Sequence, residues 1–237
     1  MSKPPLRFTP RILCRLAIRL GFLAVGPLVW GQGEFTGYLE PAINLNYSLG
    51  KGFSQNVSAG HRMYYSRNGA AELQGRQVDL ALFTSVAFLG NQSVGLGIQY
   101  RFRKPFEPDR TNEIRLTQQY NRTFRPRVIR IGHRLRSEQR IFPDQTVHRF
   151  RYRLAFDGPL QGERTDVGEW YWVGTLEQLL SVSRSQSAEW DVRAGAELGY
   201  LAADGVRTEL GTEYRREDFT HTGGHELFFT MTLVLSL

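Results

Sequence analysis

The chain of 237 residues carries 30 basic and 23 acidic side chains, a formal net charge of +7. Its length suits one large all-β domain or two small domains. The slightly negative mean hydropathy argues against helical membrane spans, but it is compatible with a β-barrel, whose strands are only half apolar.

The first thirty-three residues differ in composition from the rest of the chain. Residues 20–30 form a short apolar run, and small residues follow at 31–33. This pattern predicts a secretory signal peptide over residues 1–33, and residues 34–237 as the exported domain. An anchoring helix is the alternative, but the uncharged run is too short to span a membrane. Basic residues precede the run, with no acid among them: Lys3, Arg7, Arg11, Arg15 and Arg19.

Removal of this segment would change the charge and the thiol content. Five basic residues leave with it, so 25 basic and 23 acidic residues remain and the net charge falls from +7 to +2. This near balance removes the electrostatic support for a nucleic-acid partner. Cys14 leaves as well, so we expect no disulfides, and closure of a sheet must stabilise the fold.

From residue 42 onward, apolar and polar side chains alternate in one segment after another. Each run is long enough to cross an outer membrane as a tilted strand. One face suited to hydrocarbon and one polar or charged face predict a single antiparallel transmembrane β-barrel, located in the bacterial outer membrane. The clearest runs, in chain order, are residues 42–49, 93–103, 149–156, 189–200 and 226–237.

Glycine, proline and Asn-Gly or Asp-Gly pairs divide these runs into strands. The breaks give eleven strands if residues 35–49 form one strand. An even number is expected when both chain ends lie on the periplasmic side, so we predict about twelve strands, with ten as the alternative. Short breaks at Gly50, Gly90, Pro126 and Asp204 suit periplasmic turns, whereas the stretch 158–168 is too long for that side.

Charged residues gather on one face of the strands between residues 113 and 197. An arginine column in a narrow interior needs carboxylates or water beside it, and the planar guanidinium can bridge two carboxylates. One interpretation is a structural salt-bridge ladder that fills the lumen; the other is a selectivity or ligand surface within a pore. The predicted lumen residues are Glu113, Arg115, Arg130, Arg134, Arg136, Glu138, Arg140, Arg149, Arg151, Arg153, Glu177 and Glu197.

Three segments of this region, residues 113–119, 133–140 and 149–154, resemble a bacterial outer-membrane family catalogued as domain of unknown function 2490. Glu177 in the following strand fits the same pattern. The resemblance covers about residues 37–237. It implies an outer-membrane barrel and supplies no substrate, cofactor or catalytic residue. The chain departs from many outer-membrane barrels by ending in Leu237 rather than in phenylalanine.

No catalytic, cofactor-binding or metal-binding residues are predicted. His221 and His225 lie in a glycine-rich turn with no cysteine or close carboxylate pair, so an exposed loop is the simpler interpretation. The main hypothesis is a barrel that is structural or weakly pore-forming. Two alternatives stay open: a barrel enzyme acting on envelope lipid or peptide at the rim, and a soluble exported β-sandwich.

The expected partners follow from the barrel hypothesis. They are outer-membrane lipid and the outer-membrane assembly machinery, the latter through the C-terminal strand that ends at Leu237. A small solute is a further candidate partner, and the sequence does not identify it.

Overall fold

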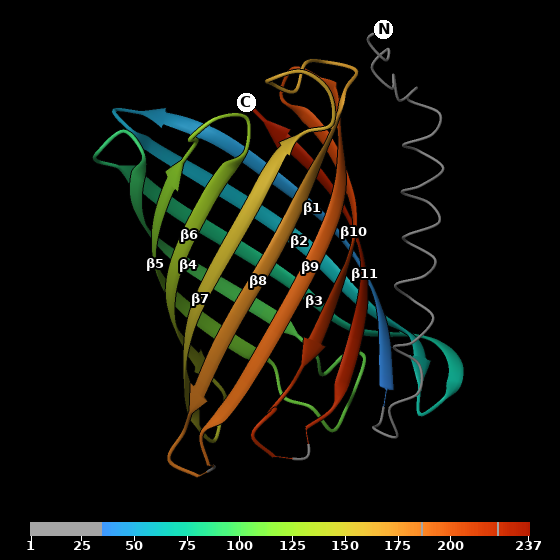
Figure 1. Cartoon of the computed structure of the whole chain (residues 1–237). Coiled ribbons are helices and arrows are strands. Elements are labelled where there is room, and N and C mark those ends of the chain that lie inside the picture. The colour runs from blue at the N-terminus through green and yellow to red at the C-terminus, as the bar shows by residue number, and fades with distance from the viewer. Residues whose placement is uncertain (1–34, 186, 222) are drawn as a thin grey trace, which may run out of the picture. The chain divides into compact units, whose positions relative to one another are not determined.

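The computed structural model describes residues 35–185, 187–221 and 223–237. Within them the chain forms eleven β-strands that join into one closed barrel (Figure 1). Each strand pairs with its neighbours in sequence, and the first pairs with the last. The strands are β1 Phe35–Gly50, β2 Phe53–Arg67, β3 Ala70–Ala87, β4 Gln92–Phe102, β5 Glu113–Phe124, β6 Arg130–Ile141, β7 Thr146–Pro159, β8 Trp170–Val182, β9 Glu189–Ala203, β10 Val206–Arg216 and β11 His225–Ser236.

Tight turns occur where the sequence contains glycine beside a short polar residue. Asn68 and Gly69 alone connect β2 to β3, and both have positive φ, 51° and 78°. Two consecutive positive φ values match the right-handed twist of the strands, which is why Asn-Gly suits this hairpin. Residues 160–169 form a long connection at the same barrel end as the short turns at Gly50 and Gly205, although their length in the sequence is unusual for that end.

The barrel closes through a parallel pair, β1 with β11, from Phe35 opposite His225 to Asn46 opposite Ser236. In Figure 1 the blue β1 runs beside the red β11. An odd number of strands requires such a pair, and it places the starts of β1 and β11 at the same end of the barrel. The predicted twelve strands, and the alternative of ten, are therefore wrong.

A twelfth strand would require a break at Pro41, which instead lies inside β1. The β1–β2 ladder has Leu39 opposite Met63 and Ala42 opposite Gly60, in the same register on both sides of the proline. Proline cannot donate a ladder hydrogen bond, and the β1–β2 ladder has no pair at Glu40 or Pro41. The strand continues because β11 pairs with it along its other edge.

The two faces of the wall have opposite chemistry. On β4, Leu96 and Ile98 are exposed on the outside, whereas Arg101 is buried on the inside. Arg136 on β6 lies over the ring of Phe83 on β3, which is three strands away around the wall, so both side chains project into the enclosed space. The lumen is therefore the polar side of the sheet.

Closure of the sheet rules out the β-sandwich alternative, because a sandwich has two separate sheets with edges. The predicted signal peptide, residues 1–33, lies outside the described residues. Across the described part of the chain, no helix has the length and apolar character needed to span a membrane.

Candidate functional site

The centre of the lumen contains a network of arginine and carboxylate side chains, and Glu113 lies at its middle. This carboxylate is 1 % exposed. It accepts hydrogen bonds from Arg115 Nε at 2.5 Å and from Arg140 Nε at 2.5 Å, and Arg101 Nη1 lies 3.8 Å away. Three guanidinium groups from β4, β5 and β6 therefore share one buried acid, which joins these strands from inside the barrel.

A second centre of the network forms on the next strands. Glu138 Oε2 accepts a hydrogen bond of 2.6 Å from Arg151, and Arg136 lies 3.6 Å from the same carboxylate. Arg151 Nη1 is also 3.5 Å from Glu177, which in turn lies 3.7 Å from Arg193. The side chains of β6, β7, β8 and β9 are thus linked across the lumen side of the wall, since Arg151 and Arg193 each reach two acids.

Arg149 differs from its neighbours. Its Nε donates to Ser181 Oγ at 2.9 Å, and no salt bridge to it is found in the described part of the chain. It lines a central cavity of about 260 Å³ together with Arg136, Arg140 and Arg151.

The remaining predicted lumen residues lie nearer one end of the barrel. Arg130, Arg134, Arg153 and Glu197 line a wider polar cavity of about 870 Å³ there. Arg130 is the most exposed of them and is paired with Asp157 at 2.8 Å. The twelve predicted residues are therefore divided between two places: eight in the central network and four in this mouth.

Several charged residues of the network were not selected from the sequence. Arg101 makes a two-pronged contact with Asp79, with both N–O distances at 2.6 Å, and Arg62 Nε donates to Glu40 at 2.7 Å. The alternation in residues 93–103 was a usable signal for Arg101. Asp79 and Glu40 are single acids between apolar neighbours, and only the strand register places an arginine beside each of them.

Beside the charged network lies a small aromatic cluster formed by Tyr38, Tyr64 and Phe228. The rings of Tyr38 and Phe228 stack with centroids 4.7 Å apart. The guanidinium of Arg215 lies 3.7 Å from the Phe228 centroid and that of Arg62 lies 4.7 Å from it. These cation–π contacts hold positive charge against an apolar surface, which narrows the lumen near β1, β2 and β11.

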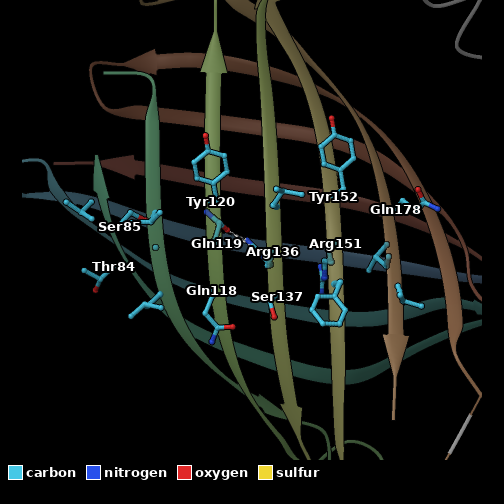
Figure 2. A pocket seen from close by; sticks show the side chains of 18 of the residues that line it. Thr84, Ser85, Gln118, Gln119, Tyr120, Arg136, Ser137, Arg151, Tyr152 and Gln178 are labelled. Atoms are coloured by element: carbon cyan, nitrogen blue, oxygen red, sulfur yellow. Dashed lines mark hydrogen bonds between the residues drawn. The ribbon is translucent and has the colours of Figure 1, made fainter. Parts of the chain in front are cut away.

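On the outside of the wall, a groove crosses the strands from β2 to β9. Exposed apolar side chains, including Leu96 and Phe150, form most of its surface, and Gln118 and Ser137 add polar groups. Figure 2 shows this wall, with Tyr120 and Tyr152 on separate strands. The dashed contact there joins Arg136 to Gln119 at 2.6 Å, on the lumen side.

The two histidines considered for a rim enzyme have separate partners. His221 Nδ1 lies 3.0 Å from Asp218 and 3.2 Å from Thr220 Oγ1. A nucleophile–base–acid relay uses both ring nitrogens, whereas here both contacts are to one nitrogen. His225 instead contacts Tyr214 and Arg216.

Over residues 35–185, 187–221 and 223–237, no group of three or more His, Cys, Asp or Glu side chains is placed to hold a metal ion. A comparison with curated proteins finds no match. Residues 41–225 match the family described as "Protein of unknown function (DUF2490)". Because the match covers more than half of the chain, including most of the central network, the chain belongs to the DUF2490 family.

Proposed function

We propose that this protein is an outer-membrane β-barrel whose lumen is crossed by the arginine–carboxylate network, so that its role is structural or weakly pore-forming. The observation that carries the proposal is the pairing of an apolar outer face with buried ion pairs inside a closed sheet. A closed barrel has no unpaired edges, and that is a condition for placing strands in hydrocarbon.

The outer face supports a lipid environment. Leu96 is 66 % exposed, Met231 57 % and Leu135 53 %, and they lie well inside their strands. In water, a continuous apolar surface of this kind would favour association, whereas in a bilayer it is in its preferred solvent. The amides of Gln118 and Gln139 hydrogen-bond to each other on this face at 3.0 and 3.2 Å, which satisfies polar groups that lipid could not.

Aromatic side chains near the strand ends also support this environment. Trp170 and Tyr200 contact each other at one end of the β8–β9 pair, with ring centroids 4.9 Å apart. Trp190, the second residue of β9, lies at the opposite end, and its carbonyl accepts a hydrogen bond from Phe219 N at 2.8 Å. Aromatic rings at both ends of the wall are typical of the interfacial girdles of membrane barrels.

The interior favours a narrow path over a wide channel. Glu113, Glu138 and Asp191 are each less than 5 % exposed, and so little exposure inside a barrel means that side chains fill the space around them. A water-filled porin lumen would leave such carboxylates solvated. We therefore expect low conductance.

Three measurements test the proposal on protein purified in detergent. A folded barrel should migrate differently on a gel before and after heating, and it should need detergent to remain in solution. In planar bilayers we expect no channel events or small ones only. Solubility without detergent and no heat-dependent shift would contradict the membrane barrel, while large stable currents would contradict the filled lumen.

We further propose that the assembly machinery recognises the last strand. β11 alternates apolar and other side chains to its end, and Leu237 N donates to Asn46 O at 2.8 Å, so the C-terminus lies at the closing seam. In cells, Leu237→Asp should reduce the amount of heat-shifting protein in the outer-membrane fraction. An unchanged amount would mean that the terminal residue is not part of the signal.

A further inference from the structure

The central cavity is enclosed by ten of the eleven strands and by two residues that directly follow strands, Arg103 and Glu217. Its volume is about 260 Å³. Of the seventeen residues that line it, eleven are arginines, five are acids, and the remaining one is Gln99. A small enclosed space with this lining is suited to a compact, highly charged occupant rather than to an apolar one.

The positive charge around the cavity exceeds the negative charge. The lining alone has eleven arginines against five acids. Four further carboxylates bind these arginines from outside the lining, which brings the acids to nine and leaves an excess of two positive charges. These four are Glu113, Glu177, Asp191 and Glu213.

Two lining residues outside the strands set limits on this count. Burial, with Glu226 and Asp191 nearby, raises the pKa of Glu217, so this carboxyl is more easily neutral than an exposed one. Burial beside Arg101 lowers the pKa of Arg103 to about 10, which still leaves it charged at neutral pH. Neither group therefore reduces the excess of positive charge near neutral pH.

Several guanidinium N–H groups around the cavity also lack partners. The Nε atoms of Arg76, Arg103, Arg151 and Arg193 are buried and have no hydrogen-bond partner among the described residues. Arg149 has a hydroxyl where its neighbours have carboxylates. Buried donors left unpaired cost free energy, so a ligand that accepts their hydrogen bonds would be bound favourably.

We propose that this cavity is a binding site for a phosphate group, held mainly by Arg149 with Arg140 and Arg193. A phosphate dianion carries close to the two negative charges that the lining lacks, and its oxygens accept from several guanidinium forks at once. The inference goes beyond the proposed function, because it requires the folded barrel but neither conductance nor insertion into a membrane. The phosphate group belongs to a free solute or to a lipid headgroup.

The test is calorimetric titration of the refolded protein in a zwitterionic, phosphate-free detergent. One arm uses inorganic phosphate and the other uses dihexanoyl phosphatidic acid. Saturable binding of inorganic phosphate supports a soluble ligand, whereas binding of the short-chain lipid alone assigns the group to a lipid headgroup. Absence of binding in both arms, with the heat-shift assay showing folded protein, overturns the proposal.

Variants connect the binding to the cavity. Loss of a charge-assisted contact in Arg149→Gln should weaken the affinity by about tenfold or more. Arg149→Lys keeps the charge and loses the fork, so an intermediate loss is expected. Arg127→Gln, at an exposed arginine outside the cavity, is the matched control and should bind as the wild type does.

Arg149→Lys also decides the result if Arg149→Gln fails to fold, since it retains the positive charge. Unchanged affinity in the folded Arg149 variants would contradict the assignment, as would an equal loss in Arg127→Gln. The binding measurement does not depend on ion flow. Phosphate binding by a non-conducting barrel would therefore still support the phosphate site. A folded barrel that conducts but does not bind phosphate would contradict the phosphate site and leave the proposed function standing.

Discussion

Glu113 is the residue on which the interior most depends, because this one buried carboxylate forms ion pairs with three arginines. Glu113→Gln removes that charge and leaves Arg115 and Arg140 buried without their acid. Breaking a buried pair in this way costs about 3–5 kcal/mol, so the free energy of unfolding in urea should fall by about that amount. Glu163→Gln, at an exposed loop position, is the control and should change it by less than about 0.5 kcal/mol.

The same measurement can contradict the filled interior. If Glu113→Gln and Glu163→Gln have equal stability, water must already solvate the arginines around residue 113. A loss of stability confined to Glu113→Gln would show instead that the ion pairs of Glu113 stabilise the packing of β4, β5 and β6.

Single-residue reasoning from the sequence could identify the arginine columns but not their partners. Alternation decides which side of a strand a residue occupies, and Arg149, Arg151 and Arg153 share a side for that reason. Register alone does not decide which acid each one meets, because Glu138 is directly opposite Arg149 in the β6–β7 ladder and yet pairs with Arg151. Arg151 reaches Glu138, whereas Arg149 meets Ser181, and nothing in their common pattern distinguishes the two.

At the scale of the strand, two sequence rules fail in this chain: that proline ends a strand, and that the strand number is even. Pro41 is a usual strand breaker, yet β1 passes through it because β11 supplies a second ladder. The expectation of an even strand number assumed that both ends of the chain lie at one end of the barrel. The parallel seam has the opposite consequence: the start of β1 and the end of β11 lie at opposite ends.

The seam can be tested by cross-linking, since Cys14 is the only native cysteine and it precedes the barrel. Ile43 and Leu233 are opposite each other across β1 and β11. Ile43→Cys with Leu233→Cys, in a Cys14→Ser background, should form a disulfide under mild oxidation, because paired strands bring Cα atoms within disulfide range.

Ile43→Cys with Leu176→Cys is the matched control, because β8 is not adjacent to β1 and no intramolecular bond should form. A gel under non-reducing conditions distinguishes the products by mobility. Failure of the Ile43/Leu233 pair to cross-link in folded protein would mean that the barrel closes in another register or with another strand count.

For the whole molecule, the alternation of side chains was enough to predict a barrel with a charged interior side, because a period of two assigns a face to every residue at once. The cavities inside the barrel could not be predicted in the same way. The cavity around Arg149 depends on how side chains from non-adjacent strands approach each other inside the barrel, as Arg136 approaches Phe83, and this distance is set by closure rather than by any local segment.

If the barrel lies in a bilayer, the cost of placing a charge on its outer face must depend on depth. Leu96 is near the middle of β4, whereas Leu73 is 78 % exposed near the turn at Asn68 and Gly69. In lipid vesicles, Leu96→Arg should lower the free energy of unfolding by about 2–4 kcal/mol, and Leu73→Arg by about 0–1 kcal/mol. Urea titrations of the vesicle-bound proteins measure both values. In detergent micelles, which deform around a charge, the difference should shrink. Equal costs at the two positions in vesicles would place the wall outside the hydrocarbon and leave the charged network as the interior of a barrel in water.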